Sequence, residues 1–124
     1  NTPNCWNIYV TGLVLEYLQS IGGVEEMARR NRKKAALLYD YLDQSHFYIA
    51  GARRDCRSMM NVIFRTDSPE LDARFVAEAA EEGLVTLKGH RVLGGMRASI
   101  YNNMPYEGVE RLVDYMQRFE KQHG

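Results

Sequence analysis

The segment Met96-Arg97-Ala98-Ser99-Ile100-Tyr101 decides the expected fold, because apolar and polar residues alternate along it. Successive side chains of a β-strand point to opposite faces, so this alternation predicts a strand with one buried face. Residues 58–65 alternate in the same way, and residues 84–87 are a shorter strand candidate. The sequence therefore predicts a small antiparallel sheet.

Helical periods fill most of the remaining chain. Thr2 and Pro3 resemble a helix cap and a first helical residue, since threonine accepts from exposed amides and proline has no N–H to lose. Residues 46–57 have no clear period and are expected to form a surface connection with little core. The order α, α, β, α, β, β, α predicts an α+β domain with helices on one face of the sheet. The four helical segments are residues 2–21, 24–42, 69–83 and 105–119.

Charge and composition exclude several classes of partner. The chain of 124 residues has 16 Lys and Arg against 16 Asp and Glu, so its formal net charge is zero. Nucleic-acid binding usually needs a broad basic surface, and a membrane-spanning helix needs roughly 20 apolar residues. The sequence offers neither, and we expect neither a nucleic-acid nor a membrane partner. Five cations in the second helix are expected to form a solvated face: Arg29, Arg30, Arg32, Lys33 and Lys34.

The two cysteines, Cys5 and Cys56, make neither a disulfide framework nor a metal-binding motif. Thiols stay reduced in reducing compartments. We therefore expect no metal site and a cytoplasmic location.

Polar residues that the fold pattern does not explain gather between residues 88 and 97. His90 and Arg91 lie among flexible glycines, and Arg97 occupies a strand position opposite the apolar face. A guanidinium offers a planar pair of donors to a carboxylate or phosphate. These three groups together predict a site for a small, multiply charged acid. Two simpler interpretations stay open, namely an arginine paired with a surface carboxylate and a histidine with a structural role.

Four runs of residues match a known family over the whole chain. They are Asn1-Thr2-Pro3 with Trp6 and Ile8-Tyr9-Val10, Lys88-Gly89-His90-Arg91, Gly94 to Asn102, and Met104-Pro105 with Glu107-Gly108-Val109. These runs resemble the phosphoserine aminotransferases of the class V aminotransferase group. The pattern KGHRxxGGxRASxYN is specific to that family.

The resemblance implies a pyridoxal-phosphate enzyme of fold type I that acts as a homodimer. Its expected reaction transfers an amino group between glutamate and 3-phosphohydroxypyruvate in serine biosynthesis, and many bacterial members also serve vitamin B6 synthesis. Residues 1–22 would then be the terminal helix of the large cofactor domain. Residues 23–124 would be the C-terminal small domain.

The resemblance also implies roles for individual residues. Arg97 matches the arginine that binds the substrate α-carboxylate. His90 and Arg91 match a pair that helps bind the substrate phosphate from the neighbouring subunit. Asn1 and Thr2 match a pair that contacts the cofactor phosphate across the dimer interface. The two ends of one substrate would thus be bound by different residues.

The chain departs from the family pattern in two respects. Val92-Leu93 stand where Ser-Val is usual, which removes a hydroxyl donor near the phosphate. None of the four lysines, at positions 33, 34, 88 and 121, matches the family lysine that binds the cofactor covalently. We therefore expect no catalytic residue here and no activity of the chain alone.

The missing initial methionine suggests a piece of a longer enzyme. The alternative is a stand-alone, non-catalytic anion-binding module, and exposed apolar residues of the first helix could also drive self-association.

Overall fold

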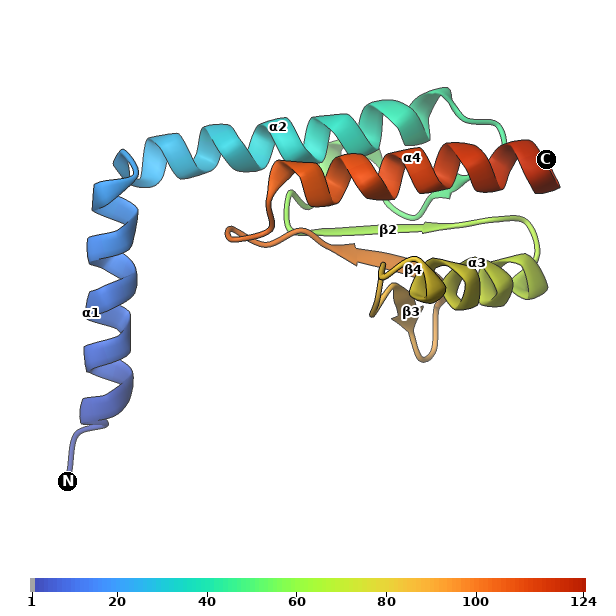
Figure 1. Ribbon diagram of the computed structural model, residues 1–124. Coiled ribbons are helices and arrows are strands. Elements are labelled where there is room, and N and C mark those ends of the chain that lie inside the picture. The colour runs from blue at the N-terminus through green and yellow to red at the C-terminus, as the bar shows by residue number, and fades with distance from the viewer. Residues whose placement is uncertain (1) are drawn as a thin grey trace.

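The computed structural model describes residues 2–124, which form four α-helices and a four-stranded sheet (Figure 1). The helix and strand periods read from the sequence account for most of these elements. In chain order the elements are α1 (Cys5–Ser20), α2 (Gly23–Gln44), β1 (Ile49–Ala50), the short 3-10 helix η1 (Arg54–Cys56), β2 (Asn61–Arg65), α3 (Pro69–Glu81), β3 (Lys88–His90), β4 (Gly94–Ser99) and α4 (Tyr106–His123).

The sheet has the strand order β1-β2-β4-β3, and every neighbouring pair is antiparallel. Within the central pair, Val62 lies opposite Ala98, and Ile63 lies opposite Arg97. The apolar side chains of β2 and β4 are buried, as the alternation predicts, whereas Arg97 is exposed. The predicted antiparallel sheet with one apolar face is confirmed.

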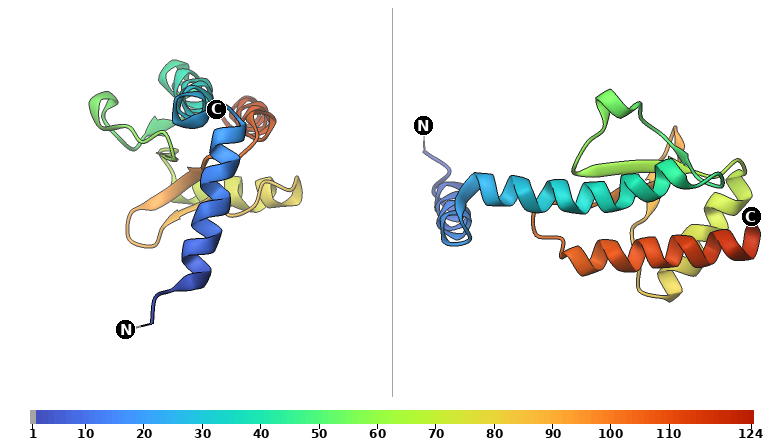
Figure 2. Two further views of the ribbon diagram at one scale, coloured as in Figure 1. Left: turned by 90° about the vertical axis from the view of Figure 1, so that its left-hand side faces the viewer. Right: turned by 90° about the horizontal axis from the view of Figure 1, so that it is seen from above.

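The apolar face of the sheet packs against α2, α3 and α4, which enclose one core. Leu38 of α2, Phe75 of α3 and Phe119 of α4 are almost fully buried in it. In Figures 1 and 2, α2 and α4 run side by side over the sheet. Helices on one face leave the opposite face open, so polar side chains of β4 can reach a ligand there.

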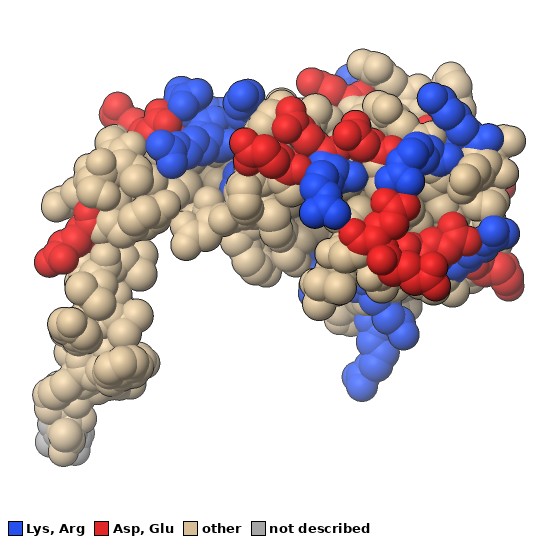
Figure 3. All heavy atoms as spheres, in the orientation of Figure 1, with Lys and Arg blue, Asp and Glu red and all other residues tan. Residues whose placement is uncertain are grey.

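Helix α1 is different because none of its residues is buried. It leaves the rest of the molecule at an angle (Figure 1), and Trp6 is 71% exposed. Figure 3 shows few charged groups over α1, whereas cations gather over the first part of α2. No helix in residues 2–124 is long and apolar enough to cross a membrane. Within residues 2–124, the apolar side chains of α1 therefore stay largely exposed.

The predicted start of α1 is wrong. The helix begins at Cys5, and its cap is Asn4, whose Oδ1 accepts from the amide of Asn7 at 3.2 Å. Asparagine and threonine are both favourable caps. Two candidates this close together cannot be ranked from local sequence alone.

Two predictions about the β-structure also need correction. Residues 84–87 form no strand, because Thr86 has a positive φ of 61° that interrupts extended backbone. The strand instead begins at Lys88, in the glycine-containing segment that carries His90 and Arg91. Residues 46–57 contain strand β1 and the core residue Tyr48, whose hydroxyl donates to the Met116 carbonyl at 3.0 Å. A two-residue strand is too short to give a recognisable period.

Candidate functional site

Arg97 lies on β4, which is an inner strand of the sheet. Its amide donates to the Leu87 carbonyl at 2.8 Å, and its buried neighbours Met96 and Ala98 point to the opposite face. The backbone that carries Arg97 is therefore held from both sides. Its guanidinium is directed to the open face, as the strand alternation predicts.

Arg97 is one of the residues that line a cavity of about 280 Å³. The cavity lies between the segment 83–87, β4 and the start of α4, and Met104 forms part of its wall. Within residues 2–124, no carboxylate forms an ion pair with Arg97, so the interpretation as a surface pair is not supported. Arg111 also lines the cavity, but it donates to the Glu82 carbonyl at 3.0 Å. The Arg97 guanidinium therefore has no carboxylate partner in residues 2–124 and is available to a carboxylate from outside this part of the chain.

His90 and Arg91 lie at the turn between β3 and β4, and both are exposed. The Nδ1 atom of His90 accepts from the Val92 amide at 3.2 Å, which orients the imidazole. Both residues line a cavity of about 530 Å³ beside the start of α3. Val92 and Leu93 complete the turn and are each 77% exposed. An edge hairpin with an exposed tip is well placed to contact a second molecule.

The structure does not bring all three predicted anion-binding residues together. Arg97 lines one cavity, whereas His90 and Arg91 line another. The expectation that they converge is therefore not met within a single chain.

The predicted cofactor contacts lie at the far end of α1. Thr2 is exposed at the N-terminal end, away from the sheet (Figure 1), and Asn1 lies outside the described residues. Neither cavity includes Thr2.

The lysines do not suit covalent attachment of a cofactor. Lys33, Lys88 and Lys121 are exposed, and the amine of the buried Lys34 donates to backbone carbonyls. An amine that bonds to a cofactor must be free to act as a nucleophile. Residues 2–124 also contain no group of three His, Cys, Asp or Glu side chains that could hold a metal ion.

Sequence reasoning missed the polar residues that surround Arg97. The hydroxyls of Ser99 and Tyr101 both donate to Asn61 Oδ1, at 3.2 and 3.3 Å. This row lies on the sheet beside the exposed guanidinium, because Asn61 is opposite Ser99. The alternation of the two strands would have placed Asn61 there, had the register been known.

The aminotransferase class V family model matches residues 1–112. The chain therefore belongs to the class V aminotransferase family.

Relatives within that family narrow the likeness further. The chain is 54% identical over 123 residues to the phosphoserine aminotransferase of Haemophilus ducreyi, covering 99% of this chain and 34% of that protein. It is also 54% identical over 120 residues to the phosphoserine aminotransferase of Bacillus cereus, covering 97% of this chain and 33% of that protein. The chain thus spans about a third of the length of the curated relatives it matches.

Solved structures agree with these relatives. Phosphoserine aminotransferase from Bacillus circulans subsp. alkalophilus matches with a TM-score of 0.94 and 48% identity, covering 100% of this chain and 35% of that one. The PLP-bound phosphoserine aminotransferase from Trichomonas vaginalis matches with a TM-score of 0.85 and 33% identity, covering 94% of this chain and 34% of that one. The α+β fold is that of a phosphoserine aminotransferase segment.

Proposed function

We propose that the chain forms the C-terminal third of a cytoplasmic phosphoserine aminotransferase. The enzyme would transfer an amino group between glutamate and 3-phosphohydroxypyruvate in serine biosynthesis, and 4-phosphohydroxythreonine formation in vitamin B6 synthesis is a second possible use of the same site. The observation that carries the proposal is the 54% identity to phosphoserine aminotransferases across the chain, together with an exposed Arg97 that has no ion-pair partner in residues 2–124. Residues 1–22 would complete the large domain, and residues 23–124 would form the small domain.

Arg97 binds the substrate α-carboxylate in this proposal. Its guanidinium provides two parallel donors, which fix the position of a carboxylate as well as attracting its charge. Its backbone is anchored in an inner strand, so little ordering free energy is lost when substrate binds. The residue contributes orientation and electrostatic attraction, and it transfers no proton.

His90 and Arg91 bind the phosphate of the substrate in the neighbouring subunit of a homodimer. Their separation from Arg97 supports this arrangement, because they line a cavity of their own. Their place at an exposed hairpin tip gives them access to another chain. Each active site would then take its carboxylate clamp from one subunit and part of its phosphate clamp from the other.

The relative from Trichomonas vaginalis is PLP-bound, and we extend pyridoxal phosphate to the intact enzyme of this chain. When bound, that cofactor supplies the electron withdrawal that amino-group exchange needs. The lysines of this chain do not fit its covalent attachment, since Lys34 is held by carbonyls and the others are exposed. Asn1 and Thr2 are proposed contacts of the cofactor phosphate. The isolated chain is therefore expected to be inactive.

The test uses the intact enzyme that carries this segment, assayed with glutamate and 3-phosphohydroxypyruvate. Arg97→Ala should lower kcat/KM about 10- to 100-fold, because hydrogen bonds to charged groups contribute roughly 1.5–3 kcal/mol. Cofactor content should stay unchanged. Arg65→Ala is the matched control, since Arg65 is exposed on the same sheet and donates to the Thr66 carbonyl. A wild-type enzyme without this activity, or unchanged kinetics for Arg97→Ala, contradicts the proposal.

The alternative of a stand-alone anion-binding module is favoured by one observation, namely that residues 23–124 enclose their own core. A module of this kind would bind O-phosphoserine by itself. Calorimetric titration of the isolated chain with O-phosphoserine distinguishes the two proposals. The enzyme proposal predicts weak binding, because each chain would hold only part of a substrate site. Tight binding of O-phosphoserine to the isolated chain would favour the module.

A further inference from the structure

Lys34 is the buried lysine of this chain, with only 2% of its surface exposed. It lies in the middle of α2, within the run of cations that the sequence predicts to be solvated. That prediction is wrong for Lys34. Burial of an ammonium group costs free energy unless its donors are satisfied. Its surroundings must therefore compensate for the loss of water.

Four backbone carbonyls between β4 and α4 provide this compensation. The Nζ atom lies 2.6 Å from the carbonyl oxygen of Tyr101 and 3.0 Å from that of Met104. The carbonyls of Asn102 and Ile100 lie at 3.3 and 3.4 Å. Three N–H donors serve four acceptors, so the contact satisfies the whole ammonium group.

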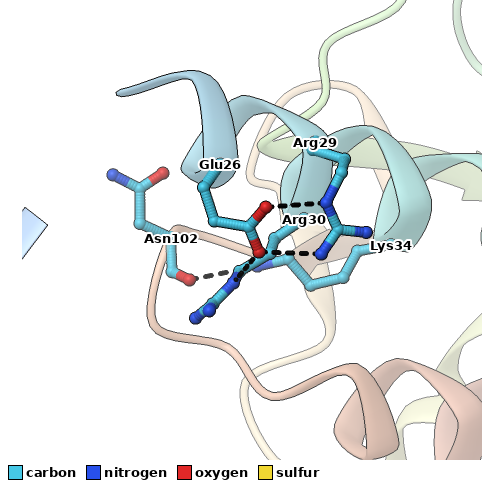
Figure 4. Close-up of polar contacts among 5 residues, drawn as sticks. All are labelled: Glu26, Arg29, Arg30, Lys34 and Asn102. Carbon is cyan, nitrogen blue, oxygen red and sulfur yellow. Dashed lines mark hydrogen bonds and ion pairs between the residues drawn. The ribbon is translucent and has the colours of Figure 1, made fainter. Parts of the chain in front are cut away.

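No carboxylate in residues 2–124 forms an ion pair with Lys34. The nearby Glu26 is already bonded to Arg29 and Arg30, with N–O distances of 2.7 and 2.8 Å (Figure 4). Desolvation lowers the pKa of Lys34 below its usual value. Its charge is balanced only by the carbonyl dipoles of one short segment, which makes the geometry of that segment depend on the lysine.

Asn31 makes a second contact with the same segment, one turn earlier on α2. Its Nδ2 donates to Asn102 Oδ1 at 2.8 Å, and Asn31 is also buried. Residues three positions apart share one face of a helix. Helix α2 therefore holds the segment at two points.

The held segment is also a wall of the Arg97 cavity. Met104, whose carbonyl accepts from Lys34, lines the cavity together with Arg97. Ile100 continues β4 directly, and its amide donates to the Met60 carbonyl at 2.8 Å. Lys34 thus contacts both the end of the strand that carries Arg97 and Met104, a residue that lines the same cavity as Arg97.

We propose that Lys34 is a positioning residue for the Arg97 carboxylate site, acting through the carbonyls of residues 100–104. It does not touch the substrate itself. Its ammonium group keeps Met104 and the end of β4 in place, so that the guanidinium meets the carboxylate in a single geometry. The assignment of that ligand rests on the proposed function.

The experiment compares Lys34→Met and Lys34→Arg in the intact enzyme, with Lys33→Met as the matched control. Lys33 is the exposed neighbour, and its ammonium lies 4.0 Å from the centre of the Tyr106 ring. Lys34→Met should raise KM for 3-phosphohydroxypyruvate about tenfold, because a small displacement of Arg97 weakens its contact with the substrate carboxylate. The kcat value should change less, Lys34→Arg should restore part of the affinity, and Lys33→Met should match the wild type. An unchanged KM for Lys34→Met overturns the proposal.

A second readout keeps the test decisive if Lys34→Met folds poorly or if the wild type lacks the proposed activity. Hydrogen exchange is followed at the amides of Ile100 and Met104, which are bonded to the carbonyls of Met60 and Tyr101. Exchange should accelerate in Lys34→Met, or in the milder Lys34→Gln, and stay normal in Lys33→Met. Unchanged exchange would overturn the proposal on its own. If the wild type is inactive but exchange accelerates in the variants, the result contradicts the proposed substrate and leaves the positioning role of Lys34 supported.

Discussion

The Arg97 cavity and the His90–Arg91 cavity belong to the same sheet but are built differently. Arg97 lies on the inner strand β4, and its cavity is closed by the segment 83–87 and α4. His90 and Arg91 lie on the edge hairpin, where Val92 and Leu93 at the tip are largely exposed. One cavity is lined by the segment 83–87, the inner strand and α4, whereas the other is lined by α3 and the edge hairpin.

The difference teaches how one chain can contribute to two sites. An inner strand is hydrogen-bonded on both edges, so it fixes a side chain accurately for a ligand bound to its own subunit. An edge hairpin has one free side and can reach a neighbouring molecule. The structure therefore places the residues proposed for the two anion-binding roles in different cavities, although the sequence has them within a few residues of each other.

The largest effect that sharpens this comparison is expected from the two glycines that begin β4, directly after the hairpin turn. Gly94 and Gly95 have similar positive φ angles of 70° and 68°. A Cβ at Gly95 would lie 2.7 Å from the Phe64 carbonyl oxygen, whereas a Cβ at Gly94 would meet nothing within 4 Å. Gly95→Ala should cost about 2–4 kcal/mol and Gly94→Ala about 1–2 kcal/mol, because both are strained but only Gly95 is packed against β2.

Urea unfolding of the 124-residue chain measures both variants. Equal losses of stability would contradict the distinction between a packed inner strand and an open edge.

A smaller effect is expected when the outward-facing cations are removed from the intact enzyme. The double variant His90→Ala, Arg91→Ala should raise KM for 3-phosphohydroxypyruvate about tenfold, since exposed charge pairs contribute up to about 1 kcal/mol each. KM for an analogue without the phosphate should hardly change. Arg97→Ala serves as the comparison, because it should raise KM for both compounds. Steady-state kinetics with the two compounds measures both KM values. An equal rise in KM for both compounds in the double variant would contradict a role of His90 and Arg91 in phosphate binding.

The sheet and the direction of Arg97 could be predicted from the sequence because both depend on local periodicity. The alternation in residues 96–101 fixed the exposed face of β4, and the apolar periods located the four helices. Strand β1 could not be predicted, since two residues carry no period. The prediction of a strand at 84–87 was wrong because Thr86 has a positive φ, which the local sequence does not indicate.

The rest of the candidate site depends on contacts between distant residues. Lys34 lies four positions before Leu38, so the helical period places it on the buried face of α2. The carbonyls that accept from it could not be predicted, since Tyr101 lies 67 positions later in the sequence. Arg97 likewise lines a different cavity from His90 and Arg91 because the segment 83–87 and α4 lie beside Arg97, whereas α3 lies beside the hairpin. The family resemblance assigned roles to Arg97, His90 and Arg91, but it could not supply the physical contacts that hold them.

The most direct test of the central claim isolates a mixed dimer of the intact enzyme with a different affinity tag on each subunit. One subunit carries Arg97→Ala and the other carries His90→Ala with Arg91→Ala. If each site takes Arg97 from one subunit and the His90–Arg91 pair from the other, one site of the mixed dimer is fully intact. Its activity at low substrate should then be about half that of the wild-type dimer, because the two sites of a twofold dimer are equivalent. Activity no higher than that of the two parent variants would contradict the claim.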